Sequence, residues 1–434
     1  MSTRITASVT PSAARLTESL RDIGYDFPAA VADIVDNSIA AGARRVEITI
    51  EFDGSGSRVF IADDGSGMTA NGLLEALRYG SRRIYGHGDL GRYGLGLKTA
   101  SLSQCRSVTV ATRSSTKTAR VSVRTLDLDL IAETDAWLVI DPGQDEVISR
   151  ARRSLMEGTG TVVVWEKLDR VLPEKRPDGG WARRRLESMA TRAVEHLGIV
   201  FHRYLEGLNG RDLVVTVNGE KVEPWNPFAA DEPSCVELPS QRFEVTFGDA
   251  SGKVLLRRFV LPSRDQFSSP ENFDRMSGPH NWNRQQGLYI YRADRLVQWG
   301  GWSSLRGIDE HTKLARASLD FDTDLDSAFN INVAKMRVAV PPQLRQMLDR
   351  PINELCSRAD DAYRKTSRRR EPSTPADQVP WAGAESTAGP ATAEAGLALR
   401  AAAMQAGEYP SFQRIVDTLR VSAPEIASAL GLEH

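Results

Sequence analysis

The sequence ADIVDNS, at residues 32–38, has the spacing of a helical turn that carries an acid and an amide on one face. Asp33 and Asn37 are four residues apart, and side chains at positions i and i+4 stack along a helix. A carboxylate there can activate water, and an amide oxygen can hold magnesium. Asp36 lies one residue before Asn37, so its side chain is expected to point about 100° away from the asparagine face. Alone, the pair is more often an ordinary polar helix face.

Two further motifs follow in order. ADDGSGM, residues 62–68, ends an expected strand and presents Asp63 beside a Gly-Ser-Gly turn. GRYGLGLKTA, residues 91–100, closes a segment with six glycines between Gly80 and Gly96. The backbone amides of such a segment can point at phosphate oxygens, and the helix expected after it would direct its amino end at the same anion. Each motif is weak alone, but their order and spacing together are specific.

Composition sets the broad class. The chain has 434 residues, 41% of them hydrophobic, which is enough for a large core and two or three domains. A net charge of −2 gives no overall basic field for nucleic acid, so such a contact would need a local patch. The arginine runs at 183–185 and 368–370 are more often solvated faces than DNA contacts.

Several classes of site are unsupported by the sequence. The three cysteines form no CxxC pair and the six histidines form no HxxxH or HExxH motif, which argues against structural zinc, a disulfide framework and a metalloenzyme. There is no apolar N-terminal region and no run of about eighteen apolar residues. We therefore expect a soluble cytoplasmic protein with no membrane partner.

Hydrophobic periodicity predicts alternating helices and strands. In the first part of the chain we expect helices over 12–23, 29–42 and 71–79, a helix after Gly96, and strands at 46–50, 58–63, 107–113, 119–128 and 161–168. In the second part we expect a helix over 181–205, a hairpin over 212–228 with Asn218-Gly219 at its turn, a strand pair around Ala293-Asp294, and an amphipathic helix beyond Pro341.

The three motifs resemble those of the GHKL ATPases, the superfamily of gyrase, Hsp-type chaperones, histidine kinases and MutL, whose nucleotide-binding unit is the Bergerat fold. The resemblance implies that ATP and Mg²⁺ are bound. Its acid-x-x-x-Asn motif matches Asp33 and Asn37, with Asn37 on the magnesium of the triphosphate. Its Asp-x-Gly-x-Gly motif matches Asp63, Gly65 and Gly67, with the Asp63 carboxylate accepting a hydrogen bond from the adenine amino group.

The third motif, Gly-x-x-Gly-x-Gly, matches Gly91, Gly94 and Gly96 and resembles the lid over the phosphates. Lys98 would be the nearby cation, although a solvated lysine is the alternative interpretation. Thr161 lies where the family has a Gly-Thr pair that completes the adenine pocket. The resemblance adds four neighbours of these motifs to the expected nucleotide contacts: Met68, Leu95, Leu97 and Thr99.

One departure from the family pattern concerns catalysis. Relatives usually have glutamate at the position of Asp33, where it orients water for attack on the γ-phosphate. Aspartate has about 1.5 Å less reach, and misplacement on that scale can cost of order a hundredfold in rate. We therefore expect a slow ATPase; the alternative is a nucleotide-gated scaffold that binds ATP without turnover. Ala40 also departs from relatives that carry an acid there, with no evident consequence.

The middle of the chain resembles the transducer domain of the MORC and MutL branches, especially prokaryotic MORC-like proteins. In those families a lysine from this domain reaches the γ-phosphate, and Lys335 in NVAKMRV matches it; an exposed strand lysine is the alternative. The resemblance implies a nucleotide-dependent homodimer that acts as a switch or clamp, with DNA or a partner protein as candidate partners. A sensor histidine kinase is a poorer candidate, because that class places its nucleotide domain after a phosphoacceptor helix.

The expected fold class is α/β (α+β): a Bergerat-type sandwich, an S5-like transducer domain and a helical C-terminal tail. The boundaries we expect are 1–175 for the ATP-binding domain, 176–345 for the transducer, 346–370 for the amphipathic helix, 371–395 for a flexible linker and 396–434 for the small helical tail.

Overall fold

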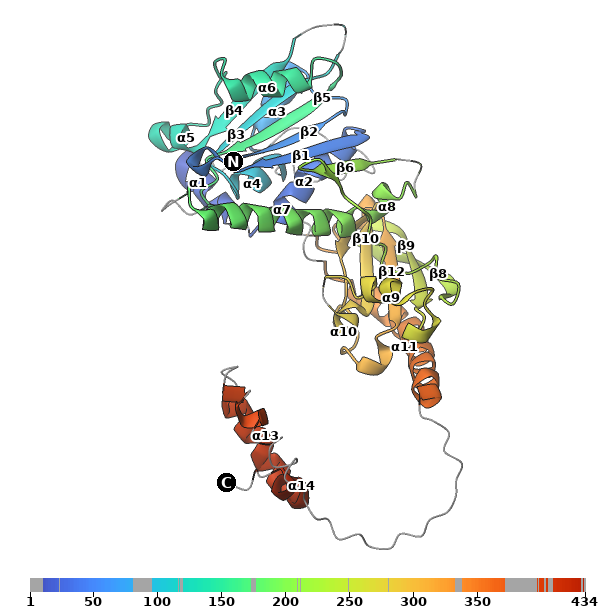
Figure 1. Ribbon diagram of the computed structural model, residues 1–434. Coiled ribbons are helices and arrows are strands. Elements are labelled where there is room, and N and C mark those ends of the chain that lie inside the picture. Colours follow the sequence, from blue (N-terminus) through green and yellow to red (C-terminus); the bar gives the residue numbers. More distant parts are fainter. Residues whose placement is uncertain are drawn as a thin grey trace, which may run out of the picture. The chain divides into compact units, whose positions relative to one another are not determined.

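Figure 1 shows the computed structural model of the chain. The structure describes residues 11–22, 24–80, 96–115, 117, 120–172, 177–208, 210, 212–248, 250–279, 281–331, 338–370, 396, 398–401, 403–404, 409–430 and 432, and all structural statements concern these residues. The chain forms two compact units, Met1–Glu371 and Pro372–His434. Each is described by itself.

The first unit begins with a mixed seven-stranded sheet (Figure 1). Neighbouring strands are antiparallel except for the parallel pair β1 and β6. In spatial order the strands are β4 (Ser122–Asp127), β3 (Ser107–Arg113), β5 (Gly160–Glu166), β2 (Arg58–Asp63), β1 (Arg45–Glu51), β6 (Val214–Val217) and β7 (Glu220–Lys221). The helices of this part are α1 (Ala13–Arg21), α2 (Phe27–Ala40), α3 (Ala70–Leu77), α4 (Gly96–Leu102), α5 (Leu128–Thr134), α6 (Glu146–Ser154), α7 (Gly180–Val200) and α8 (His202–Leu205).

Both faces of this sheet are covered. On one face, α2, α4 and α7 share a core with Val163 and Trp165 of β5. On the other face, α6 packs against Val162 and Val164 of the same strand. Successive side chains of a strand point to opposite faces, so the continuous apolar sequence of β5 is explained by burial on both sides.

A second, five-stranded sheet follows within the same unit. Its strands are, in spatial order, β11 (Arg295–Gln298), β10 (Gly287–Arg292), β12 (Ala315–Phe321), β9 (Ala250–Val260) and β8 (Val236–Phe247). Only β10 and β12 are parallel. Its short helices are α9 (Pro270–Arg275) and α10 (Trp282–Gln285), and the long helix α11 (Pro342–Arg370) packs on it through Leu344, Leu348, Ile352 and Leu355. The second unit contains α13 (Tyr409–Ser422) and α14 (Pro424–Ala429).

The predicted fold class is confirmed: the fold is mixed α/β with two mixed sheets. Most expected elements are present within a few residues of the expected bounds. The expected strand over 119–128 is wrong at its end, because Asp127 accepts a hydrogen bond from the amide of Asp129 at 2.8 Å and starts α5. The expected helix over 181–205 is divided at Phe201 into α7 and α8.

The elements that were not expected from the sequence include α5, α6, α9, α10 and the long hairpin of β8 and β9. The assignment of the second sheet as a transducer stays a prediction, as do the expected domain bounds. None of the helices within the described ranges has both the length and the hydropathy that a bilayer crossing needs.

Candidate functional site

Helix α2 carries the first motif. Asp26 caps it by accepting a hydrogen bond from the amide of Ala29 at 2.9 Å, and Pro28 occupies its first turn, where a missing N–H costs nothing. Almost every residue of the helix is buried, Asp33 included at 1% exposure, whereas Asn37 is exposed. An exposed amide one turn after a buried carboxylate is available to a ligand.

The carboxylate of Asp33 is held by two segments. Tyr25 donates its hydroxyl to Oδ2 of Asp33 at 2.7 Å, and burial together with this carboxylate raises the pKa of Tyr25, so that the hydroxyl stays a donor. A Cβ placed on Gly96 would lie only 3.0 Å from the same oxygen. The first residue of α4 therefore lies directly against Asp33, and the first and third motifs meet there.

Asp63 is where the first and second motifs meet. Ser38, the residue after Asn37, donates its hydroxyl to Oδ2 of Asp63 at 3.0 Å. The amides of Gly65 and Thr161 donate to Oδ1 at 2.9 and 3.2 Å. Burial raises the pKa of the Asp63 carboxyl above its ordinary value, against the lowering effect of these three hydrogen bonds. The carboxylate at the end of β2 thus has a fixed orientation.

The glycine at position 67 is required by the protein's own backbone. Its φ is +62°, and a Cβ there would lie 2.1 Å from the carbonyl oxygen of Arg113. Met68, next in the chain, donates its amide to Oγ1 of Thr112 at 2.8 Å, and this hydroxyl donates in turn to the carbonyl of Gly160 at 3.0 Å. The turn after β2 is therefore fixed to the end of β3 and the start of β5.

Helix α4 presents the remaining described residues of the third motif, of which Leu97 is half-buried and Thr99 is buried. Lys98 is fully buried and is not the solvated lysine of the alternative interpretation. Its ammonium donates to the carbonyl of Ala76 at 2.7 Å and lies 5.6 Å from the centre of the Tyr79 ring. Burial lowers the pKa of Lys98 to about 8. Its expected role beside the phosphates stays a prediction.

Four expected site residues lie outside the described part of the chain: Gly91, Gly94, Leu95 and Lys335.

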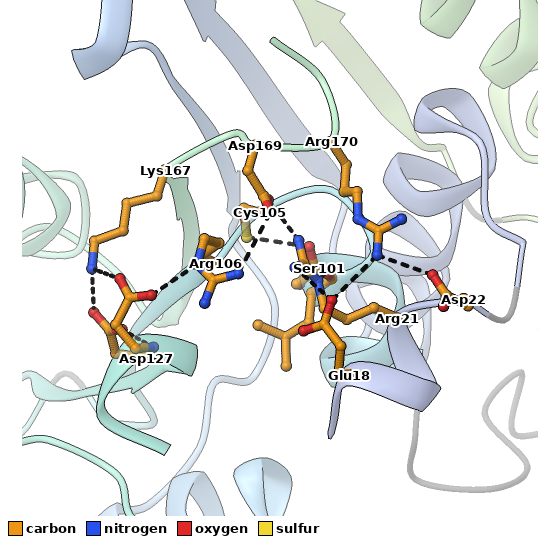
Figure 2. Close-up of polar contacts among 12 residues, drawn as sticks. Glu18, Arg21, Asp22, Ser101, Cys105, Arg106, Asp127, Lys167, Asp169 and Arg170 are labelled. Carbon is orange, nitrogen blue, oxygen red and sulfur yellow. Dashed lines mark hydrogen bonds and ion pairs between the residues drawn. The ribbon is translucent and has the colours of Figure 1, made fainter. Parts of the chain in front are cut away.

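The far end of α4 is fixed by a network of charges (Figure 2). Arg21, on α1, donates from Nε to the carbonyl of Leu102 at 2.7 Å and from Nη2 to Asp169 at 2.5 Å. The network continues through Arg106, which donates to Asp129 at 2.8 Å and also lies 3.7 Å from Asp169. Helix α4 therefore begins beside Asp33, and its last residue is hydrogen-bonded to α1.

Reasoning from the sequence missed several residues of this site. Ser38 could have been identified from the sequence, because it follows Asn37 directly and serine is a common donor to a carboxylate. Tyr25 and Thr112 carry no local motif. Arg295 carries none either, yet it donates to both carboxylate oxygens of Asp36, which was expected to point away from the asparagine face.

Comparison with known proteins finds a family match for this part of the chain. Residues 25–159 match the family model for histidine kinase-, DNA gyrase B-, and HSP90-like ATPases. The match includes Asp33, Asn37 and Asp63 and ends shortly before Thr161. No curated protein matches the chain. Residues 25–159 are thus similar to the GHKL-type ATPases, and the mixed α/β fold around them is consistent with that superfamily.

Proposed function

We propose that the chain binds ATP with Mg²⁺ between α2, the end of β2 and the start of α4, and hydrolyses it slowly. The observation that carries this proposal is the convergence on Asp63. Its carboxylate receives hydrogen bonds from Ser38, Gly65 and Thr161, which come from three separate segments of the chain. A side chain fixed in this way is suited to recognise one edge of a base.

The hydrogen-bonding capacity of Asp63 supports an adenine partner. An ionised carboxylate offers about four acceptor positions, and donors from the described residues occupy three of them. One position remains for a donor such as the amino group of adenine.

The residues also fit magnesium bound through a triphosphate. Among the described residues, no cluster of three or more His, Cys, Asp and Glu side chains is arranged to hold a metal ion. Magnesium commonly keeps several waters and binds through one or two protein oxygens plus substrate phosphates. Asn37 supplies one exposed oxygen of the right kind. When bound, the ion would neutralise charge on the phosphates and polarise the γ-phosphate.

We further propose that nucleotide binding promotes a homodimer that acts as a switch or clamp, with DNA or a partner protein as the client. Support comes from the resemblance to the MORC and MutL branches and from the expected position of Lys335. Asp33 would orient the attacking water, and Lys98 and Lys335 would face the phosphates.

A second candidate function is a nucleotide-gated scaffold that does not hydrolyse ATP. A specific observation favours it: the Asp33 carboxylate is short, 1% exposed and hydrogen-bonded to Tyr25. In that case the same site binds ATP, and the change of state depends on binding alone.

Isothermal titration calorimetry tests the binding site. We expect wild-type protein to bind ATP in the presence of magnesium and Asp63→Asn to bind it at least about tenfold more weakly, because the amide presents a donor to the adenine amino group and one lost hydrogen bond of this type is worth about 1.5 kcal/mol. The control is Asp64→Asn, since Asp64 is exposed and accepts only from the amides of Arg44 and Arg45 among its described contacts. Absence of binding heat with wild-type protein would overturn the proposal.

A further inference from the structure

A buried ion pair joins the second sheet to α2. Arg295, the first residue of β11, donates from Nε to both carboxylate oxygens of Asp36, at 2.9 and 2.8 Å. The side chains of Arg295 and Asp36 are 4% and 0% exposed. Asp36 lies directly before Asn37 and three residues after Asp33, so this contact joins α2 at the proposed nucleotide site to a strand 259 residues away in the sequence.

The turn that presents Arg295 is itself fixed. Ala293 and Asp294, between β10 and β11, both have positive φ, 45° and 67°, as a tight two-residue hairpin requires. Tyr204 of α8 donates its hydroxyl to the carbonyl of Ala293 at 2.6 Å. Arg203, also on α8, donates to Asp294 at 3.1 Å. These contacts fix the turn of the hairpin, so Arg295 is not expected to move independently of it.

Burial makes this contact effectively all-or-none. A buried guanidinium and carboxylate attract each other strongly while they are paired, and separating them leaves two charges without water. The guanidinium of Arg295 also lies 5.8 Å from the centre of the Phe201 ring, at the junction of α7 and α8. A shift or rotation of α2 must therefore either carry the hairpin with it or break the pair at high cost.

We infer that Arg295 is a positioning residue, which holds α2 through Asp36 and couples the nucleotide site to the second sheet. The inference rests on the proposed binding of ATP. A nucleotide that contacts Asn37 changes the position of α2, and the ion pair transmits that change to the hairpin of β10 and β11. Coupling between two sites is reciprocal, so the state of the second sheet also sets the affinity of α2 for nucleotide.

The critical variant is the pair Asp36→Asn/Arg295→Gln, which removes both charges of this ion pair together. A matched control is Asp326→Asn/Arg292→Gln. Arg292 and Asp326 form a similarly buried pair, with both hydrogen bonds at 2.7 Å. Arg292 is on β10 and Asp326 follows β12, and neither has a hydrogen bond to α2 among the described contacts. Arg295→Lys, which keeps the charge, is a second variant in case the neutral pair folds poorly.

The measurements are ATP affinity by calorimetry, and hydrogen–deuterium exchange of peptides that cover residues 287–298, with and without Mg-ATP. We expect ATP to slow exchange of these peptides in wild-type protein and in the control, and to have no effect on them in Asp36→Asn/Arg295→Gln at saturating ATP. Arg295→Lys should retain part of the response.

An unchanged response in Asp36→Asn/Arg295→Gln overturns the inference. So does wild-type protein that binds ATP without any change in these peptides. Wild-type protein that binds no ATP overturns the proposed function instead, and the coupling with it, so the two failures are distinguished by the calorimetry.

Discussion

The length of the side chain at position 33 decides between the two candidate functions. Asp33→Glu adds one methylene, about 1.5 Å of reach, and Asp33→Ala removes the carboxylate. For an ATPase, we expect phosphate release at saturating Mg-ATP to be lost in Asp33→Ala and to be retained or raised in Asp33→Glu. If the shorter side chain misplaces the attacking water, the gain would be of order a hundredfold at most. The longer side chain must fit beside Tyr25, which donates a hydrogen bond to Asp33.

ATP affinity measured on the same variants separates a defect in hydrolysis from one in binding. If wild-type protein, Asp33→Ala and Asp33→Glu all bind ATP and none of them releases phosphate, the protein is a nucleotide-gated scaffold. Phosphate release by Asp33→Ala at the wild-type rate would remove Asp33 from the mechanism.

The raised pKa of Asp63 predicts how ATP binding depends on pH. Only the ionised carboxylate has its full acceptor capacity, and burial moves its protonation to higher pH than the ordinary 3.8. Affinity should therefore fall on acidification, by up to about tenfold per pH unit below the raised pKa. Calorimetry of Asp63→Asn over the same pH range is the control, because it shows the contribution from titration of ATP itself. Equal pH profiles for wild-type protein and Asp63→Asn would contradict a role of Asp63 in ATP binding. The stability of the protein without ATP depends on pH in the opposite sense. Because the pKa of Asp63 is raised in the folded state, its contribution to the free energy of unfolding falls as pH rises through that pKa.

The sequence indicates the residues of the candidate site that carry local motifs and gives no signal for those that only the fold brings together. Asp33, Asn37 and Asp63 could be identified because each lies in a short pattern with fixed spacing. Arg295 reaches Asp36 across 259 residues, and no pattern near Arg295 distinguishes it from the other arginines of the chain. Long-range pairing of side chains is set by sheet order, which sequence periodicity does not determine.

The helices and strands that the sequence predicts have regular apolar spacing, and those that it misses do not. The strands β1, β2, β3 and β5 have strongly apolar faces and were expected. In β8, only Leu238 and Val245 are buried, so its sequence gives no clear alternation although it pairs with β9 along most of its length. Helix α6 has nine residues, mostly polar, of which Val147, Ile148 and Ala151 are buried, and this is shorter than the window over which helical periodicity is read.

Helix α7 is the element on which the proposed contact with DNA can be tested. One face of it lines a shallow hollow of about 330 Å³ with Trp181, Arg184, Arg185, Ser188, Met189 and Arg192. Arg184 and Arg192 are exposed, as is Trp181 at 54%. Arginines bind phosphates and an exposed indole can stack on a base. We expect Arg184→Gln/Arg192→Gln to weaken retention in a gel shift and to lower the slope of log affinity against log salt by about 2.

A matched control removes the same charge elsewhere. Arg242 and Arg275 are exposed on the second-sheet side of the unit, and Arg242→Gln/Arg275→Gln should leave the salt slope unchanged. Equal losses in both double variants would mean that only net charge matters, and no retention of wild-type protein with a nonhydrolysable ATP analogue would count against DNA as the client.

For the whole molecule, the proposed dimer and the proposed ATP site are linked thermodynamically. If two copies associate more tightly with ATP bound, then association must tighten ATP binding by the same factor. The apparent dissociation constant of a nonhydrolysable ATP analogue should therefore fall as protein concentration rises through the range in which light scattering shows dimer formation. In Asp63→Asn, the dimer should require more analogue. Two results would show that ATP binding and dimer formation are independent. One is a dimer that forms equally with and without nucleotide; the other is an analogue affinity that does not change with protein concentration while dimers form. ATP binding would then lack the assembly role that a switch or clamp requires.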